Sequence, residues 1–529
     1  MPARQMGGVF LLVAVLVALM SANCRSRNES FTIVLDANPE TLDPLRGTDV
    51  SSERLRQLMF NSLVRKNEKF EYVGELASNI QTAEDGLTVT FTLHDGVAFH
   101  NGQPLTSADV KYSIDTVLST DSRKNASFYE EIPGQGRTSR IASIDAPDAR
   151  TLVVRLRKPW NDLLPNLVPI GIIPQGSDGT HKTQPVGSGP FRFVRYDESQ
   201  MVVDLIADEK HWQGASNIKQ LRARGIQDSN TLQAELRSGR VDLAANTINL
   251  TPDTYKALAQ APDLKVEQFP GANIIYLGFN VQSAPLNDAR VRQAIAYAID
   301  REGIVRDLLQ GQGRIAHSIL PEALWAYTPG QSYSYDPARA RQLLDEAGFR
   351  DPDGDGPQMR FPKPVNFKVS SSNATARQYA GVMQNALKEV GIPVEIETME
   401  TVSLLTQLRN GQFQMTTSSW VGGNQDPVFL RDLFATSEIP TQERAGRNRS
   451  RYSNPELDRI LQEAVNISPD RDREKAKALY ARAQEIVSRD LPMLPLWYSA
   501  NMIVARKNVG NIKIDASGDW SFMRNLTVE

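Results

Sequence analysis

Hydrophobic and polar positions along the chain follow two periods, which predicts a mixture of strands and helices. Apolar runs of strand composition recur at residues 31–37, 87–93, 273–281, 493–499 and 502–507. Helical spacing is clearest in residues 286–309, where Val291, Ile295 and Ile299 recur every four residues on one face. Strands and helices succeed one another through both halves of the chain, which favours an α/β fold.

An internal similarity supports this organisation. Residues 232–245 and 404–417 have the same order of helix, glycine turn and strand, with Gly239 and Gly411 at the same place. Each glycine can adopt the left-handed conformation that ends a helix. The two units indicate either two lobes of related architecture or a chance likeness of two helix-to-strand units.

The first residues predict export. Arg4 precedes an apolar stretch, residues 7–20, which has the length of a signal-peptide core and is short for a membrane span. Cys24 follows and is the single cysteine of the chain. We therefore expect a lipoprotein signal peptide over 1–23, a lipid anchor at Cys24, a tether over 24–30 and a location in the periplasm or cell envelope, held to a membrane. Asn23 departs from the Gly, Ala or Ser that lipoprotein signals favour, so secretion without a lipid stays open.

Composition narrows the class of protein. The chain has 529 residues, with 59 basic and 62 acidic side chains and a net charge of −3. There is no electrostatic drive toward nucleic acid, and the arginine cluster near residue 449 is interpreted as a solvated loop. A mature chain of roughly 500 residues exceeds what one hydrophobic core supports, so two or more lobes are expected.

Sequence motifs for catalysis are absent. The histidines are dispersed, and the chain has no HExxH pair, no GxSxG elbow and no phosphate-binding GxxxxGK[ST] loop. We expect neither an enzyme, a cofactor nor a bound metal, so energy from ATP has to come from a partner. A secreted hydrolase is the alternative, and turnover of a peptide or glycoside would be needed to support it.

An acidic stretch at residues 351–356 resembles the first half of a calcium loop. Pro362 stands where the closing bidentate carboxylate of such a loop belongs, which excludes a complete EF-hand. A polar surface loop is the favoured interpretation, and a loosely held Ca²⁺ is the alternative.

Aromatic and polar residues at strand ends and glycine-rich turns suit a ligand cleft. Flat rings bury apolar area, while amides and carboxylates fix the orientation of a ligand. Packing in the core is the competing interpretation for each of them. The candidates are Tyr276, Asn280, Trp420, Asn424, Asp426 and Trp497.

The order of several long motifs resembles family 5 of the bacterial extracellular solute-binding proteins. This group comprises the dipeptide-, oligopeptide- and nickel-binding components of ABC transporters. The matching stretches are NPETLDP at 38–44, residues 85–115, VGSGPFRF at 186–193, VRQAIAYAIDREGIV at 291–305, and Tyr335-Asp336 leading to ARQLLDEAGF at 340–349. Together they extend over nearly the whole mature chain.

The resemblance implies a periplasmic-binding-protein-like fold with two lobes, a hinge and an inserted subdomain. Lobe I would comprise 31–60, 186–272 and 495–529, with 61–185 as its inserted subdomain, and lobe II would comprise 273–494. Chain crossings near Phe279 and Pro495 would form the hinge. A monomer is expected to close on a small molecule or peptide and to present it to the permease subunits of an ABC transporter.

The resemblance also shows where this chain departs from peptide binders. Gly423 stands where relatives carry the aspartate that binds the peptide amine, and Ser370 stands where dipeptide binders carry the arginine for the carboxylate. Either another acid such as Asp426 serves, or the ligand is not a free peptide. Peptide stays the leading class, with sugars, opines or metal chelates as alternatives. An alternative function is that of a sensor or chaperone without a transport role.

Overall fold

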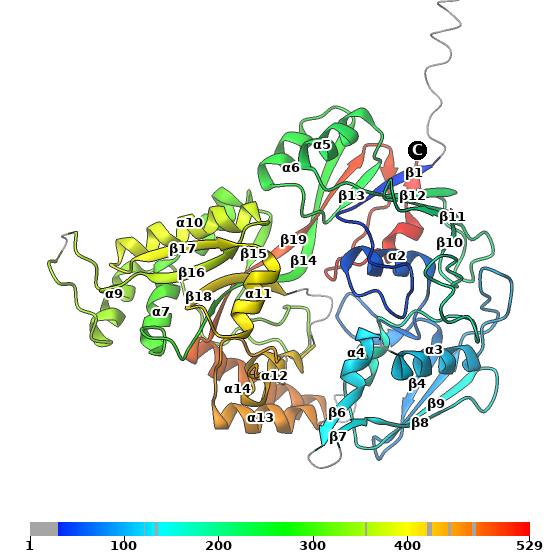
Figure 1. Ribbon diagram of the computed structural model, residues 1–529, viewed down its shortest axis with the longest axis horizontal. Helices are drawn as coiled ribbons and strands as arrows, with labels where there is room; N and C mark the ends of the chain where they lie inside the picture. The colour runs from blue at the N-terminus through cyan, green and yellow to red at the C-terminus, as the bar shows by residue number, and fades with distance from the viewer. Residues whose placement is uncertain are drawn as a thin grey trace, which may run out of the picture.

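The computed structural model describes residues 30–529 apart from 121, 133–135, 355–356, 421–425, 443–445 and 468–471. The predicted signal peptide at 1–23 and Cys24 lie outside the described residues, as do Gly423 and Asn424 of the predicted ligand site. The described chain forms two α/β bodies, joined by two long strands that run between them (Figure 1). This confirms the predicted α/β class.

One sheet of eleven strands extends through both lobes. Its order is β10-β11-β12-β1-β13-β19-β14-β18-β16-β17, and β15 pairs with β19. The strands are β1 (Phe31–Leu35), β10 (Phe191–Asp197), β11 (Val202–Ala207), β12 (Gln220–Gly225), β13 (Leu243–Ala245), β14 (Leu264–Phe279), β15 (Gly313–Ile315), β16 (Val365–Ser370), β17 (Val394–Met399), β18 (Met415–Trp420) and β19 (Met493–Arg506).

A second sheet, in the order β4-β5-β9-β8, lies within the predicted subdomain. Strand β5 alternates between half-buried and buried positions, as expected for a strand with one face on a core. Helix α3 begins at Ser107 behind a capping box of Thr106 and Asp109, as the sequence predicts. The hydrophobic core beneath this sheet is continuous with that of the first lobe. The short strands outside the large sheet are β2 (Val64–Lys66), β3 (Tyr72–Gly74), β4 (Ala77–Thr82), β5 (Thr88–Leu93), β6 (Tyr129–Ile132), β7 (Gly136–Ser139), β8 (Ile141–Asp145), β9 (Thr151–Leu156), β20 (Val509–Gly510) and β21 (Thr527–Val528).

Helices cover the large sheet and divide between the lobes (Figure 1). The first lobe has α2 (Val50–Met59), α3 (Ser107–Ser119), α4 (Leu163–Leu167), α5 (Ser229–Ser238) and α6 (Pro252–Ala259). The second has α7 (Ala289–Ala298), α8 (Arg301–Gly303), α9 (Pro337–Glu346), α10 (Ala374–Glu389), α11 (Thr401–Arg409), α12 (Phe429–Phe434), α13 (Pro455–Val465) and α14 (Arg473–Asp490). The predicted helical face is buried, and Asp300 caps the helix that follows it by accepting from the Gly303 N–H.

The two helix-to-strand units of the sequence are alike in detail. Gly239 and Gly411 both have left-handed backbones, with φ of 71° and 72°. An arginine covers each turn, because Arg506 Nη1 donates to the Gly239 carbonyl at 3.1 Å and Arg451 Nη2 donates to the Arg409 carbonyl at 2.8 Å. The similarity therefore extends beyond the glycines to the group that covers each helix end.

Strands β14 and β19 carry the chain between the lobes. Their antiparallel ladder is irregular at two places, between Phe269 and Asn273 and between Ile275 and Tyr276. The second irregularity lies opposite Pro495, while Phe279 lies deeper in the core of the second lobe. A Cβ on Gly271 would lie 1.9 Å from the Ser499 carbonyl oxygen, so the backbones approach too closely there for any other residue.

Candidate functional site

A hairpin of the first lobe reaches the second. Strands β2 and β3 pair with each other, and Phe70 between them lies in the same hydrophobic cluster as Tyr276 of β14. On the second lobe the facing segment begins at Asp426, just before α12. The two lobes therefore meet around the hairpin and the start of α12.

A polar cluster occupies this meeting point. Tyr72 donates a hydrogen bond to Asp426 Oδ2 at 3.0 Å, and the backbone N–H of Val428 donates to Asp426 Oδ1 at 2.9 Å. The Lys66 ammonium lies near the same carboxylate. Burial raises the pKa of Asp426, and burial lowers the pKa of Lys66 to about 8. The cluster thus holds opposite charges from both lobes in a place that water reaches poorly.

A second acid, Asp162 of the first lobe, belongs to the same cluster. Arg431 Nη2 of α12 lies 3.9 Å from Asp162 Oδ2 and donates to Asp432 at 3.0 Å. Burial, with the nearby charge of Asp426, raises the pKa of Asp162 to about 7. Two carboxylates with raised pKa values therefore face each other across the lobes.

Further bonds link the lobes at the same side of the molecule. Asn161 donates to the carbonyls of Val465 and Ile467, each at 2.7 Å, and Arg473 forms an ion pair with Glu71 at 3.1 Å. In Figure 1, α12, α13 and α14 accordingly lie beside α4 and β6. The lobes are in direct contact here in the described conformation.

Aromatic side chains form the second-lobe side of the region. Tyr276 is buried and stacks on Trp420, with ring centroids 6.2 Å apart and an interplanar angle of 11°. Phe429 meets the Trp420 ring edge-on at 5.3 Å. The guanidinium of Arg449 lies 5.2 Å from the centroid of Trp420. This combination of flat rings and one cation suits a ligand with an apolar body and a charged end.

Three of the predicted ligand residues come together, namely Tyr276, Trp420 and Asp426. Asn280 lies elsewhere in the second lobe, where its amide donates to the carbonyls of Gly411 and Phe413 at 3.0 Å each. Trp497 is buried in another cluster of that lobe, edge-on to Tyr379 at 5.1 Å. The arrangement favours a structural role for Asn280 and Trp497, because their side chains are already occupied.

Sequence reasoning missed the partners of these residues: Lys66, Tyr72, Asp162, Arg431 and Arg449. The interpretation of the arginine cluster as a solvated loop is wrong for Arg449, whose Nε is buried. No local pattern identifies such residues, since Tyr72 and Asp426 are 354 positions apart.

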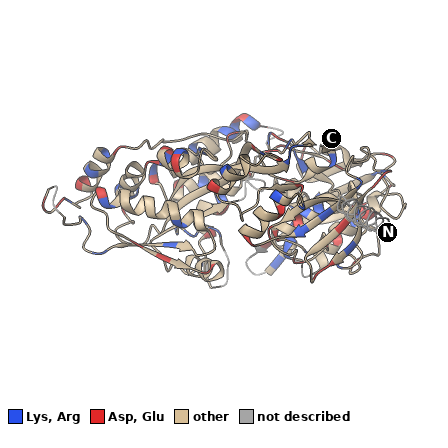
Figure 2. Cartoon of the chain, turned by 90° about the horizontal axis from the view of Figure 1, so that it is seen from above, with Lys and Arg blue, Asp and Glu red and all other residues tan. Residues whose placement is uncertain are grey.

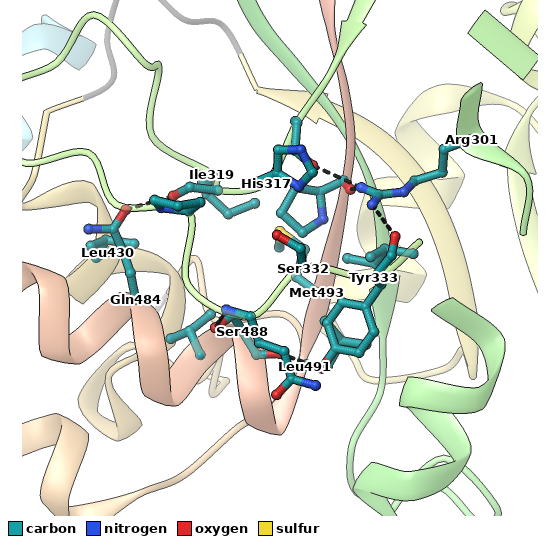
Figure 3. Close-up of a pocket in the computed structure, with 17 residues that line it drawn as sticks. Arg301, His317, Ile319, Ser332, Tyr333, Leu430, Gln484, Ser488, Leu491 and Met493 are labelled. Carbon is teal, nitrogen blue, oxygen red and sulfur yellow. Dashed lines mark hydrogen bonds between the residues drawn. The ribbon is translucent and has the colours of Figure 1, made fainter. Parts of the chain in front are cut away.

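A small pocket inside the second lobe is a different feature (Figure 3). Its volume is about 20 Å³, enough for a water molecule and too small for a solute. Arg301 lines it and donates to the carbonyls of Ala316, Tyr333 and Pro495 at 2.6 to 2.8 Å. These bonds tie three segments of the lobe together, so the cavity belongs to the core.

Other kinds of site find little support. Within the described residues, no group of three or more His, Cys, Asp or Glu side chains is arranged to hold a metal ion. At the acidic loop, Asp351 lies 3.6 Å from Arg360, and Asp353 accepts from the Gln358 N–H. In the view of Figure 2, acidic and basic residues are intermixed over the visible helices and strands of both lobes. No helix in the described part of the chain has the length and apolar character of a membrane span.

Two α/β lobes, joined by two crossing strands and meeting around polar and aromatic side chains, define a two-lobed solute-binding protein. Residues 71–441 match the family model of the bacterial extracellular solute-binding proteins, family 5 middle, and the chain belongs to this family. Its members are carriers of ABC importers, not enzymes, which confirms the predicted class.

Relatives extend along most of the chain. Heme-binding protein A of Haemophilus influenzae is 28% identical, covering 90% of this chain and 88% of the relative. The oligopeptide-binding protein AppA of Bacillus subtilis is 26% identical, covering 91% and 88%. Among solved structures, AppA of Bacillus subtilis with a nonapeptide has a TM-score of 0.74 at 24% identity, covering 94% and 99%. NikA of Brucella suis with Fe(III)-EDTA has a TM-score of 0.83 at 23% identity, covering 94% and 100%. The fold is therefore that of the periplasmic binding proteins.

Proposed function

We propose that this protein captures a small solute, with peptide as the leading class, between its two lobes and delivers it to the permease of an ABC importer. The observation that carries the proposal is the meeting of the β2–β3 hairpin with Trp420, Asp426 and α12. Closure of two lobes on a ligand is favoured only by contacts that the ligand makes with both. Side chains from both lobes converge at this one region, so a solute held there would contact both.

Peptide is supported by the relatives, several of which are named as oligopeptide-, dipeptide- or glutathione-binding proteins. Others bear the names of heme- or nickel-related binding proteins, so the cargo has to be found by experiment. Gly423 and Ser370 remove the two usual anchors of a dipeptide. We therefore expect a cargo whose ends are held by other groups.

The N-terminal part of the proposal is a lipid anchor on Cys24, which would hold a monomer at the membrane surface near its permease. Replacing Cys24 by Ser should move the protein from the membrane fraction to the soluble fraction. An unchanged distribution would contradict the anchor and leave solute binding unaffected.

Identification of the bound solute tests the function itself. We expect mass spectrometry of the extract from purified protein to show one class of small compound. That class should then raise the melting temperature when added back, because a ligand that binds only the folded state stabilises it. If no di- to pentapeptide raises the melting temperature, the cargo is not a peptide.

A further inference from the structure

The charges at the meeting of the lobes do not balance among the described residues. Asp426 has Tyr72 and Lys66 beside it, and Asp162 has Arg431. Asp432 accepts from Arg431 and forms an ion pair with Arg447 at 2.9 Å. Each of these three acids therefore has a cation of the protein beside it.

Arg449 is a further cation among the described residues of this region. Within the described part of the chain it forms no ion pair with a carboxylate: its guanidinium donates to the Tyr276 hydroxyl, and its buried Nε has no hydrogen-bond partner. The guanidinium lies over the Trp420 ring, which weakly attracts a cation but offers no oxygen acceptor. A partly buried guanidinium that has only a neutral hydroxyl beside it is unfavourable, since its other donors lose water without gaining an anion.

The raised pKa values of Asp162 and Asp426 also shift the charge of the region toward positive. A proton that Asp162 retains near its pKa of about 7 removes a negative charge from the region, and burial shifts the pKa of Asp426 in the same upward direction. An anion that enters the region thus meets an excess of positive charge. A cargo ammonium, by contrast, would have to displace Lys66 from Asp426.

We propose that Arg449 binds a carboxylate of the cargo, and that the cargo is an anion that needs no free α-amino group. The proposal rests on the proposed solute-binding function and narrows its substrate class. Lys66 lies next to Asp426, in the place that the amine of a peptide would otherwise occupy. The planar guanidinium can hold a carboxylate through two parallel N–H donors, while Trp420 packs against the apolar part of the solute.

Four probes and three variants test this. The probes are trialanine, N-acetyl-trialanine, trialanine amide and citrate, with binding measured by calorimetry and by thermal shift. The variants are Arg449→Gln, Arg449→Lys and the control Arg459→Gln, which removes the same charge from an exposed position of α13. Circular dichroism and the urea midpoint establish that each variant is folded.

We expect N-acetyl-trialanine to bind within about threefold of trialanine, and trialanine amide to bind at least about tenfold more weakly. Arg449→Gln should lose at least about tenfold for the two acids and nothing for the amide. Arg449→Lys should lose part of this affinity, because it keeps the charge without the fork of donors. Arg459→Gln should bind like the wild type.

The outcomes separate this proposal from the proposed function. If trialanine amide binds as well as trialanine, or if acetylation abolishes binding, peptide carriage stands and the anion proposal is wrong. If only citrate binds, and binds through Arg449, the cargo is a non-peptide anion and the proposal holds. If none of the four probes binds, the anion proposal is overturned, and the extracted solute alone decides the function.

Discussion

The crossing of β14 and β19 makes a quantitative prediction for Gly271→Ala. A Cβ at this position would lie 1.9 Å from the Ser499 carbonyl oxygen and 3.1 Å from the Asn501 nitrogen. Both atoms belong to the backbone of β19, so no side chain can rotate away to make room. One strand therefore has to move by more than about 1 Å. Overpacking of this kind typically costs about 1–3 kcal/mol, and we expect Gly271→Ala to lower the free energy of unfolding by about 3 kcal/mol.

Gly381→Ala is the matched control. Gly381 lies within α10, and its Cβ would meet no other heavy atom within 4 Å. Alanine is the better helix former, so this variant should gain about 0.5–1 kcal/mol. The same chemical change thus has opposite signs at the two positions.

Urea unfolding of the wild type and both variants measures these free energies, and small-angle scattering reports the angle between the lobes. We expect Gly271→Ala to lower the unfolding midpoint and to change the radius of gyration. A loss below about 1 kcal/mol with unchanged scattering would show that the strands tolerate a side chain there, and the reasoning on this close approach would be refuted.

Three further changes test the site and its surroundings. Asn280→Ala should lower stability by about 1–3 kcal/mol, because it leaves the buried Phe413 carbonyl and the half-buried Gly411 carbonyl without this donor, and it should leave cargo affinity unchanged. A loss of affinity at full stability would instead identify Asn280 as a ligand residue. Tyr72→Phe should weaken the contact between the lobes by about 1 kcal/mol and raise the radius of gyration of the unliganded protein. Asp162 has a pKa of about 7 when folded, above its ordinary value of 3.8, so the folded state binds this proton more tightly and loses stability as the pH rises between these values. Relative to Asp162→Asn, the wild type should therefore become less stable from pH 5 to pH 8, and parallel stability curves of the two proteins would contradict this.

Local features of the fold could be predicted from the sequence because their causes are local. The capping box of Thr106 and Asp109 and the buried face of Val291 and Ile295 depend on spacing within one helix. The two final strands predicted by the sequence are one strand, β19, in the structure. Ser499 and Asn501 suggest a break, but the ladder accommodates them at the irregularity between Phe269 and Asn273 of β14.

Only some residues of the candidate site could be predicted from the sequence. Trp420 and Asp426 stand in a short segment whose composition suits a ligand site. The roles of Lys66, Tyr72 and Arg449 depend on contacts with residues from other segments of the chain. The sequence around each of them therefore does not indicate these roles. Charge compensation between two lobes arises only in the folded protein, so it leaves no periodic pattern in the sequence.

The shared sheet has a consequence for the order of events during synthesis. Strand β1 is laid between β12 and β13, and β13 in turn needs β19 as its neighbour. The core of the first lobe also includes Ile503, Trp520 and Leu526. At about 5 to 20 residues per second, roughly 25 to 100 seconds separate the synthesis of β1 from that of these residues. The first lobe therefore stays unfinished until almost all of the chain has been made, which leaves the growing polypeptide in a state that an export channel can thread.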